Sequence, residues 1–120
     1  MTLGMATPEG LIEKAILRYL GMRGDCLFWK VKTTGTYDAK LGRYRVSSPL
    51  YRKGVADIIC VYKGQPLAIE VKSEKGRLTV EQQLFLKEFV EHGGRALVAR
   101  SVEHVMKFFS QLDSPPSVLR

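Results

Sequence analysis

The alternation of apolar and polar positions divides this chain into three helical and four extended segments. Apolar residues recur at helical spacing after Thr7, Thr79 and Ser101, and each of these three residues is a favourable N-cap. Short apolar runs between the helical segments are typical of strands. The pattern predicts helices over residues 8–20, 79–92 and 102–112, and strands over residues 26–31, 58–62, 67–72 and 96–99. The apolar sides expected for the last two helices are Leu84, Phe85, Phe89 and Val90, and Val105, Met106 and Phe109.

The two central strands are separated by a turn at Lys63-Gly64-Gln65-Pro66, which predicts a β-hairpin. Because the strands of a hairpin run in opposite directions, the start of one lies beside the end of the other. Asp57 should therefore meet Glu70 and Lys72, and these last two project to the same face of the sheet. Two carboxylates and an ammonium group at one point suit metal-assisted hydrolysis of a phosphodiester.

The order of the elements predicts the topology. A helix that joins the second hairpin strand to the strand at residues 96–99 makes a right-handed crossover between parallel neighbours. The expected result is an α/β fold, a small mixed β-sheet flanked by helices, in a single domain over residues 1–120 with a tail at residues 113–120. Residues 33–53 interrupt this order, either as a hairpin that extends the first strand through Leu41-Gly42 or as a long loop.

The chain has a formal net charge of +7 and a pI near 9.6, which favours a polyanionic partner. Residues 33–54 contribute +4, since five basic residues are offset by one acid, Asp38. The basic residues are Lys40, Arg43, Arg45, Arg52 and Lys53, and the tyrosines among them are Tyr37, Tyr44 and Tyr51. This pattern fits phosphate contacts with base stacking, and it fits equally a solvated loop whose tyrosines pack on the domain.

Other features exclude several classes of protein. The chain has no apolar run long enough for a transmembrane helix and no visible secretory signal, so we expect a cytoplasmic protein that is not secreted. Cys26 and Cys60 lie in apolar runs and are expected to be buried, reduced thiols. His92 and His104 show no metal-ligand spacing with either cysteine.

A set of motifs in order along the chain resembles a known group of nucleases. The motifs are Gly54-Val55-Ala56-Asp57, Glu70-Val71-Lys72, Leu78-Thr79-Val80-Glu81-Gln82 and Gly93-Gly94. They are similar to those of the PD-(D/E)xK superfamily and, within it, of the VRR-NUC branch. The resemblance covers residues 8–111. It implies a restriction-endonuclease-like core and a metal-dependent deoxyribonuclease activity.

The resemblance also implies a metal site. Asp57, Glu70, the backbone carbonyl of Val71 and an acid near the start of the first helix would bind one or two Mg²⁺ ions, with Mn²⁺ as a substitute. Glu9 is the best positional match for the helix acid, and Glu13, one turn further on, is the alternative.

The catalytic set implied by the same resemblance is Asp57, Glu70, Lys72 and Gln82. Lys72 would orient or deprotonate the attacking water, and Gln82 would help to position the lysine, the water or the phosphate. The basic residues between positions 40 and 53 would hold the DNA backbone without reading its bases.

Each of these residues also has an ordinary structural interpretation. Asp57 could be exposed in a turn, Glu70 and Lys72 could form an ion pair, and Gln82 could serve the capping box of Thr79. An acid in the first turn of a helix complements the helix dipole in any protein. The alternative functions are therefore a catalytically silent DNA-binding module with a nuclease-like fold, and an interaction protein that only shares the fold.

The size of the chain leads to an expectation about assembly. One site in a domain of 120 residues cuts one strand. Stand-alone relatives resemble junction-resolving enzymes, which place two sites across a two-fold axis. We therefore expect a homodimer that prefers branched DNA such as four-way junctions. The interface would come from residues 26–31, from the last helix or from residues 114–120.

Overall fold

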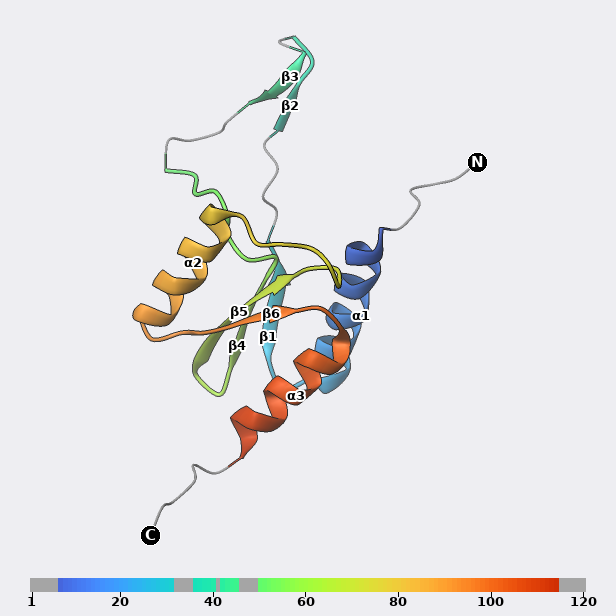
Figure 1. The fold of residues 1–120 in the computed structure, drawn as a ribbon, viewed down its shortest axis with the longest axis vertical. Helices are drawn as coiled ribbons and strands as arrows, with labels where there is room; N and C mark the ends of the chain where they lie inside the picture. Colours follow the sequence, from blue (N-terminus) through green and yellow to red (C-terminus); the bar gives the residue numbers. More distant parts are fainter. Residues whose placement is uncertain (1–6, 32–35, 41, 46–49, 115–120) are drawn as a thin grey trace.

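The computed structural model describes residues 7–31, 36–40, 42–45 and 50–114, without the side chains of residues 36–38 and 43–45. Its centre is a four-stranded sheet in the order β1-β4-β5-β6, which Figure 1 shows among three helices. The strands are β1 (Leu27–Lys30), β4 (Ile58–Tyr62), β5 (Gln65–Val71) and β6 (Arg95–Ala99). Strands β1, β4 and β5 are antiparallel neighbours, and β6 runs parallel to β5. The predicted α/β fold with a small mixed sheet is confirmed.

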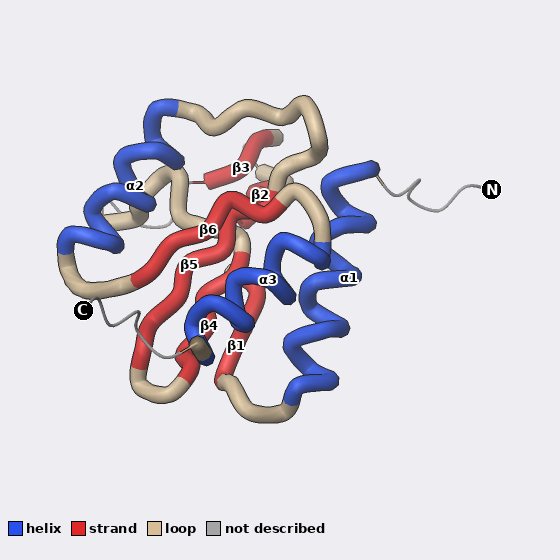
Figure 2. The backbone as a smooth tube through the Cα atoms, turned by 60° about the horizontal axis from the view of Figure 1, so that its bottom comes forward, coloured by secondary structure: helices blue, strands red, loops and turns tan. Residues whose placement is uncertain are grey.

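Helices α1 (Pro8–Arg23) and α3 (Val102–Asp113) lie on one face of the sheet, and α2 (Val80–Glu91) lies on the other (Figure 2). Each helix begins at its predicted cap, because the hydroxyls of Thr7, Thr79 and Ser101 each accept a hydrogen bond from a backbone N–H three residues on. Helix α1 runs three residues past its expected end and stops at Gly24, whose φ of 69° suits glycine.

The hairpin turn is shorter than expected. It consists of Lys63 and Gly64 alone, with φ values of 51° and 78°, so β5 already begins at Gln65 and Pro66 pairs with Val61. Two consecutive residues with positive φ form the kind of turn whose twist matches that of the flanking strands. The four-residue turn predicted from the sequence is therefore wrong.

The basic segment forms a separate antiparallel hairpin of β2 (Thr36–Asp38) and β3 (Arg43–Arg45). Figure 1 shows this arm standing away from the four-stranded sheet. The sequence was compatible with either a hairpin or a long loop over residues 33–53. The hairpin is present, although β2 and β3 form a sheet of their own and do not extend the main one.

The larger part of the core lies between the sheet and the pair α1 and α3, and a smaller part lies under α2. The larger cluster contains mainly these buried residues: Ile16, Leu20, Ile58, Cys60, Tyr62, Leu67, Ile69, Val71, Ala99, Val105, Phe108 and Phe109. The smaller cluster is built on Ala56, Ala68 and Leu86. Both cysteines are free, but only Cys60 is buried, while Cys26 is half-buried.

The faces of the last two helices differ from the expected ones. In α2 the exposed Leu84 and Val90 were expected to face the core, and Leu86 does so instead. In α3 Met106 is exposed and Phe108 is buried. The reason is that both helices place positions i, i+3, i+4 and i+7 against the sheet, and the sequence alone left the rotation of this stripe undecided. Asp113 belongs to α3, and residues 115–120 of the predicted tail lie outside the described residues.

Within the described part of the chain, none of the helices is long and apolar enough to cross a membrane.

Candidate active site

The two carboxylates of the hairpin lie opposite each other at one end of the sheet. The register pairs Ile58 with Ile69, so the preceding Asp57 faces the following Glu70. Glu70 points to the face covered by α2, because Gln82 of that helix donates a hydrogen bond to it. The hairpin thus brings together the residues that the sequence placed at this end.

Glu70 is the one charged residue that is fully buried among those the structure describes, with 1% of its surface exposed. Its Oε2 accepts a hydrogen bond from Nε2 of Gln82 at 3.1 Å and lies 3.9 Å from Nζ of Lys72. Its Oε1 is buried and has no hydrogen-bond partner in the described part of the protein. A buried carboxylate oxygen without a donor is costly, which points to a ligand at this position.

Burial raises the pKa of Glu70 to about 8 from an ordinary value of 4.5, and both the negative charge of Asp57 and a side-chain hydrogen bond with Asp57 add to the shift. The positive charge of Lys72 lowers the pKa of Glu70, and the charge of Glu9 raises it further, but both effects are smaller. Glu70 therefore retains a proton near neutral pH unless a cation replaces it.

Asp57 is half-buried rather than exposed in a turn. Its Oδ2 accepts a hydrogen bond from the backbone N–H of Val71 at 2.7 Å, and its own carbonyl accepts one from the N–H of Val31 at 2.8 Å. The residue therefore joins the end of β5 to the segment after β1. The role of the Val71 amide was not anticipated from the sequence, which pointed only to the Val71 carbonyl as a ligand.

Lys72 and Gln82 are both held in place by backbone groups. The N–H of Lys72 donates to the carbonyl of Ala99 at 3.0 Å, and 12% of the lysine side chain is exposed. Oε1 of Gln82 accepts from the N–H of Thr79 at 2.9 Å, while its Nε2 reaches Glu70. The capping role and the site role of Gln82 are therefore not alternatives, because one side chain fills both.

The two candidate acids of α1 have different surroundings. Glu13 forms an ion pair with Lys30 at 2.9 Å. Glu9 is half-buried, and its charge acts on Glu70. Of the two, Glu9 is thus the acid that is electrostatically linked to the pair.

No set of three or more Asp, Glu, His or Cys side chains is already arranged as metal ligands in the described ranges. The donor set nevertheless fits a hard divalent cation, because Asp57 and Glu70 supply carboxylate oxygens and Oε1 of Glu70 has no other partner among the described residues. For Glu9 to act as a third carboxylate ligand, its side chain would have to lie closer to Asp57 and Glu70.

The basic residues proposed to bind DNA have different environments. Arg52 forms a two-point contact with Glu88 at 2.8 and 3.3 Å, and its guanidinium lies 5.3 Å from the centre of the Phe85 ring. It thereby fastens the chain before Gly54 to α2. Lys40 and Lys53 are exposed. The side chains of Arg43 and Arg45 lie outside what the structure describes.

Gly54 is a site-forming residue whose physical role the sequence did not reveal. Its φ is 81°, and a Cβ added to it would lie 2.6 Å from the carbonyl oxygen of Glu81 and 2.7 Å from the amide nitrogen of Gln82. The chain before Asp57 thus packs directly on the first turn of α2. The signal in the sequence was the glycine of the Gly-x-x-Asp motif.

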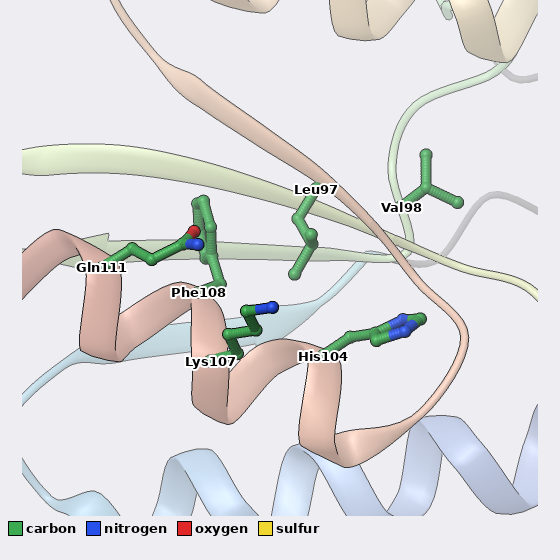
Figure 3. A pocket seen from close by; sticks show the side chains of 6 residues that line it. All are labelled: Leu97, Val98, His104, Lys107, Phe108 and Gln111. Carbon is green, nitrogen blue, oxygen red and sulfur yellow. The ribbon is translucent and has the colours of Figure 1, made fainter.

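A pocket of about 320 Å³ lies between β6 and α3 (Figure 3). It is lined by Leu97, Val98, His104, Lys107, Phe108 and Gln111. None of these side chains is a carboxylate, so the pocket lacks the donor set for a cation.

Comparison with known proteins agrees with this geometry. The family model of the VRR-NUC domain matches residues 47–103, which include both carboxylates, Lys72, Gln82 and Gly54. No curated protein matches the chain. The matched segment supplies every element of the hairpin, α2 and β6. The chain therefore carries a match to the VRR-NUC domain over residues 47–103, and its mixed sheet flanked by helices is consistent with a core like that of the PD-(D/E)xK nucleases.

Proposed function

We propose that this protein is a metal-dependent endonuclease that hydrolyses phosphodiester bonds in DNA. The match to the VRR-NUC domain supports a nuclease that acts on DNA. The observation that supports the metal-dependent chemistry is the buried Glu70, whose Oε1 has no donor among the described residues while Asp57 lies opposite and Lys72 lies beside it.

The residues that would hold a Mg²⁺ or Mn²⁺ ion are Asp57, Glu70 and the carbonyl of Val71, with Glu9 as a further ligand. When bound, such an ion neutralises charge on the scissile phosphate and makes a coordinated water more acidic. The protein's own contribution is a rigid frame, because Asp57 is already anchored on the Val71 amide.

Lys72 and Gln82 act on the nucleophile and the charge around it. Because Nζ of Lys72 lies close to Oε2 of Glu70, it is placed to orient a water and to accept its proton once deprotonated. Gln82 holds one carboxylate oxygen of Glu70 through its amide, and the other oxygen, Oε1, has no donor among the described residues.

The arm and the exposed basic residues would contact the DNA backbone. The net charge of +7 provides long-range attraction to a polyanion. Lys40 is exposed in the turn between β2 and β3, and Lys53 is exposed on the chain between the arm and β4. Figure 1 shows the arm beyond one end of the four-stranded sheet. Phosphate contacts of this kind position DNA without reading its sequence.

We further propose that the active form is a homodimer that prefers branched DNA. Among the described strands β1 ends the sheet, and two of its apolar residues are exposed, Leu27 at 65% and Trp29 at 47%. A second copy covering this edge would remove both from water and set two sites across a two-fold axis. Two sites in fixed relation suit a junction, where two strands must be cut.

The direct test is cleavage of a DNA panel consisting of duplex, flap, splayed arm and four-way junction, with Mg²⁺, Mn²⁺, Ca²⁺ or EDTA. We expect cleavage with Mg²⁺ and Mn²⁺, and binding with little cleavage in Ca²⁺, since its looser coordination does not enforce the same geometry. Asp57→Asn, Glu70→Gln and Lys72→Ala should each lower kcat by at least about 10²-fold.

The same variants should keep most of their affinity for DNA, because binding depends mainly on the basic surface. Wild-type turnover in any one of them would remove that residue from the mechanism. If the wild-type protein binds DNA but cleaves none of the panel with either metal, the protein is a silent DNA-binding module.

A further inference from the structure

Arg100, which follows β6, makes an unusual set of contacts with the loop after Lys72. Its Nη1 donates hydrogen bonds to three backbone carbonyls, those of Ser73 at 2.7 Å, Gly76 at 2.7 Å and Glu74 at 3.3 Å. These are charge-assisted bonds, and the contacts with Ser73 and Gly76 are partly buried. One guanidinium nitrogen therefore holds the whole turn that joins β5 to α2.

The backbone of Arg100 is fixed as well. Its N–H donates to Nδ1 of His104 in α3 at 3.0 Å, and the carbonyl of the preceding Ala99 accepts the N–H of Lys72 at 3.0 Å. The arginine is thus anchored between α3 and the end of β5. Its side chain cannot shift without breaking the hydrogen bonds that hold the turn.

The loop that Arg100 holds lies against the stem of Lys72. A Cβ placed on Gly76 would lie 3.4 Å from Cδ of Lys72 and 3.1 Å from Oγ of Ser73, so the turn folds back over the lysine. The Gly76 N–H closes the turn on the Ser73 carbonyl at 3.1 Å. Through this loop, a change at Arg100 acts on the position of the lysine ammonium.

We propose that Arg100 is a positioning residue for the nuclease reaction, which clamps residues 73–76 over Lys72 and so keeps the Lys72 ammonium beside Glu70. This inference rests on the proposed function for its effect on turnover. The clamp itself is a property of the fold. Arg100 touches none of the groups expected to contact the metal or the phosphate, so its effect is transmitted by the loop alone.

The test first measures the clamp without reference to activity. The loop contains two exposed trypsin sites, Lys75 and Arg77. Replacing Arg100 by Met keeps an apolar stem and removes the guanidinium. Cleavage after Lys75 or Arg77, followed by mass spectrometry, should accelerate at least about tenfold, because the variant lacks the charge-assisted hydrogen bonds that hold the turn closed.

The second measurement is steady-state cleavage of the preferred DNA. Arg100→Met should lower kcat by about 10- to 100-fold with KM within about twofold of wild type, since displacing a catalytic group by a small distance has costs of that order. Arg100→Lys, which retains the charge and three N–H donors but has a shorter total reach and no guanidinium plane, should be intermediate in both measurements. If Arg100→Met does not fold, Arg100→Lys takes its place in both measurements.

Arg95→Met is the matched control. Arg95 begins β6, the strand that Arg100 follows; it is exposed, and its guanidinium lies 5.8 Å from the centre of the Phe108 ring. This variant should change neither trypsin cleavage in the loop nor kcat.

The outcomes separate the two claims. Faster loop cleavage with unchanged kcat would overturn the positioning role, and so would unchanged loop cleavage in both Arg100 variants. If wild-type protein shows no nuclease activity while the loop still opens in Arg100→Met, the proposed function fails and the clamp remains.

Discussion

At the scale of single residues, Glu70 combines features that an ordinary core residue does not show. It lies among apolar residues of β5, where a lone carboxylate is costly, and one of its oxygens has no donor among the described residues. Gln82 and Lys72 stabilise its other oxygen. The buried position of Glu70 therefore lowers the stability of the folded protein, which is common for groups that bind ligands.

The first prediction concerns the pH dependence of stability without metal. The pKa of Glu70 is raised to about 8 in the folded protein, so the folded state keeps a proton that the unfolded chain releases near 4.5. This contribution to the free energy of unfolding is fully present below pH 4.5 and is lost as the pH rises through about 8. Its loss lowers the free energy of unfolding by up to about 1.4 kcal/mol per pH unit in that window.

Urea denaturation in EDTA between pH 4.5 and 9 measures this effect. Glu70→Gln, which cannot titrate, should flatten the decline. An identical pH profile for wild type and variant would mean that Glu70 does not hold a proton in the folded protein.

At the scale of elements, the site depends on how closely the segment before β4 approaches α2. Gly54 touches the backbone of Glu81 and Gln82, and Arg52 is fastened to Glu88 of the same helix. These contacts set the distance between the Asp57 end of β4 and the helix that presents Gln82. The glycine is required both by its positive φ and by the absence of space for a side chain.

The second prediction follows from this close approach. Gly54→Ala should lower the free energy of unfolding by about 3 kcal/mol, because a strained φ and an overpacked contact act together. Its cleavage rate should also fall, since the first turn of α2 must move away from Glu70. Gly64→Ala is the control, with a similar φ of 78° and open space around it. An equal loss of stability in the two variants would show that close packing at Gly54 has no effect.

The third prediction concerns the arm. Replacing Arg43, Arg45 and Lys53 by Ala should weaken binding to all DNA sequences alike. The slope of log K against log salt should become less steep by about 0.9 for each DNA phosphate that the variant no longer neutralises. Fluorescence anisotropy over a range of salt concentrations gives this slope.

Arg52→Ala provides the comparison. Because Arg52 is paired with Glu88, its removal should reduce stability and leave the salt slope nearly unchanged. A fixed slope in the triple variant would assign the arm a role other than phosphate binding.

At the scale of the whole molecule, the charged arm lies beyond the end of the sheet where β1 ends and β4 begins (Figure 1), and the strand register places the carboxylate pair at that same end. The apolar edge of β1 runs down one side of that sheet. Substrate binding, chemistry and assembly are therefore assigned to different surfaces, which allows each to be changed separately.

The fourth prediction is that the protein is a dimer through β1. Light scattering coupled to gel filtration should give twice the chain mass of 13.5 kDa at micromolar concentration. Leu27→Lys should give the monomer mass, because it places a charge in the apolar interface. Met22→Lys, a substitution of an even more exposed apolar residue on α1, should remain a dimer.

A wild-type mass near 13.5 kDa would exclude a stable dimer. Competition binding tests the preference for branched DNA. Equal affinity for a four-way junction and a duplex of matched length would leave a general nuclease.

The sequence by itself determined the order of the three helices and the four strands of the main sheet, and it predicted which residues meet at the candidate site. Helix caps, strand runs and the crossover are local or nearest-neighbour properties, and Thr7, Thr79 and Ser101 begin the three helices as predicted. The opposition of Asp57 and Glu70 follows from hairpin geometry, which needs only the two strands and their turn. Even a wrong turn length did not disturb it, because the strand ends stayed in place.

The tertiary structure alone decided which faces are buried and which residues support the site. The rotation of α2 and α3 about their axes depends on contacts with a sheet distant in sequence, so Leu86 and Phe108 could not be chosen over Leu84 and Met106 beforehand. The same holds for Arg100, which reaches the Lys72 loop only because β6 lies parallel to β5. Such residues come together through packing between segments distant in sequence, which a local sequence pattern does not predict.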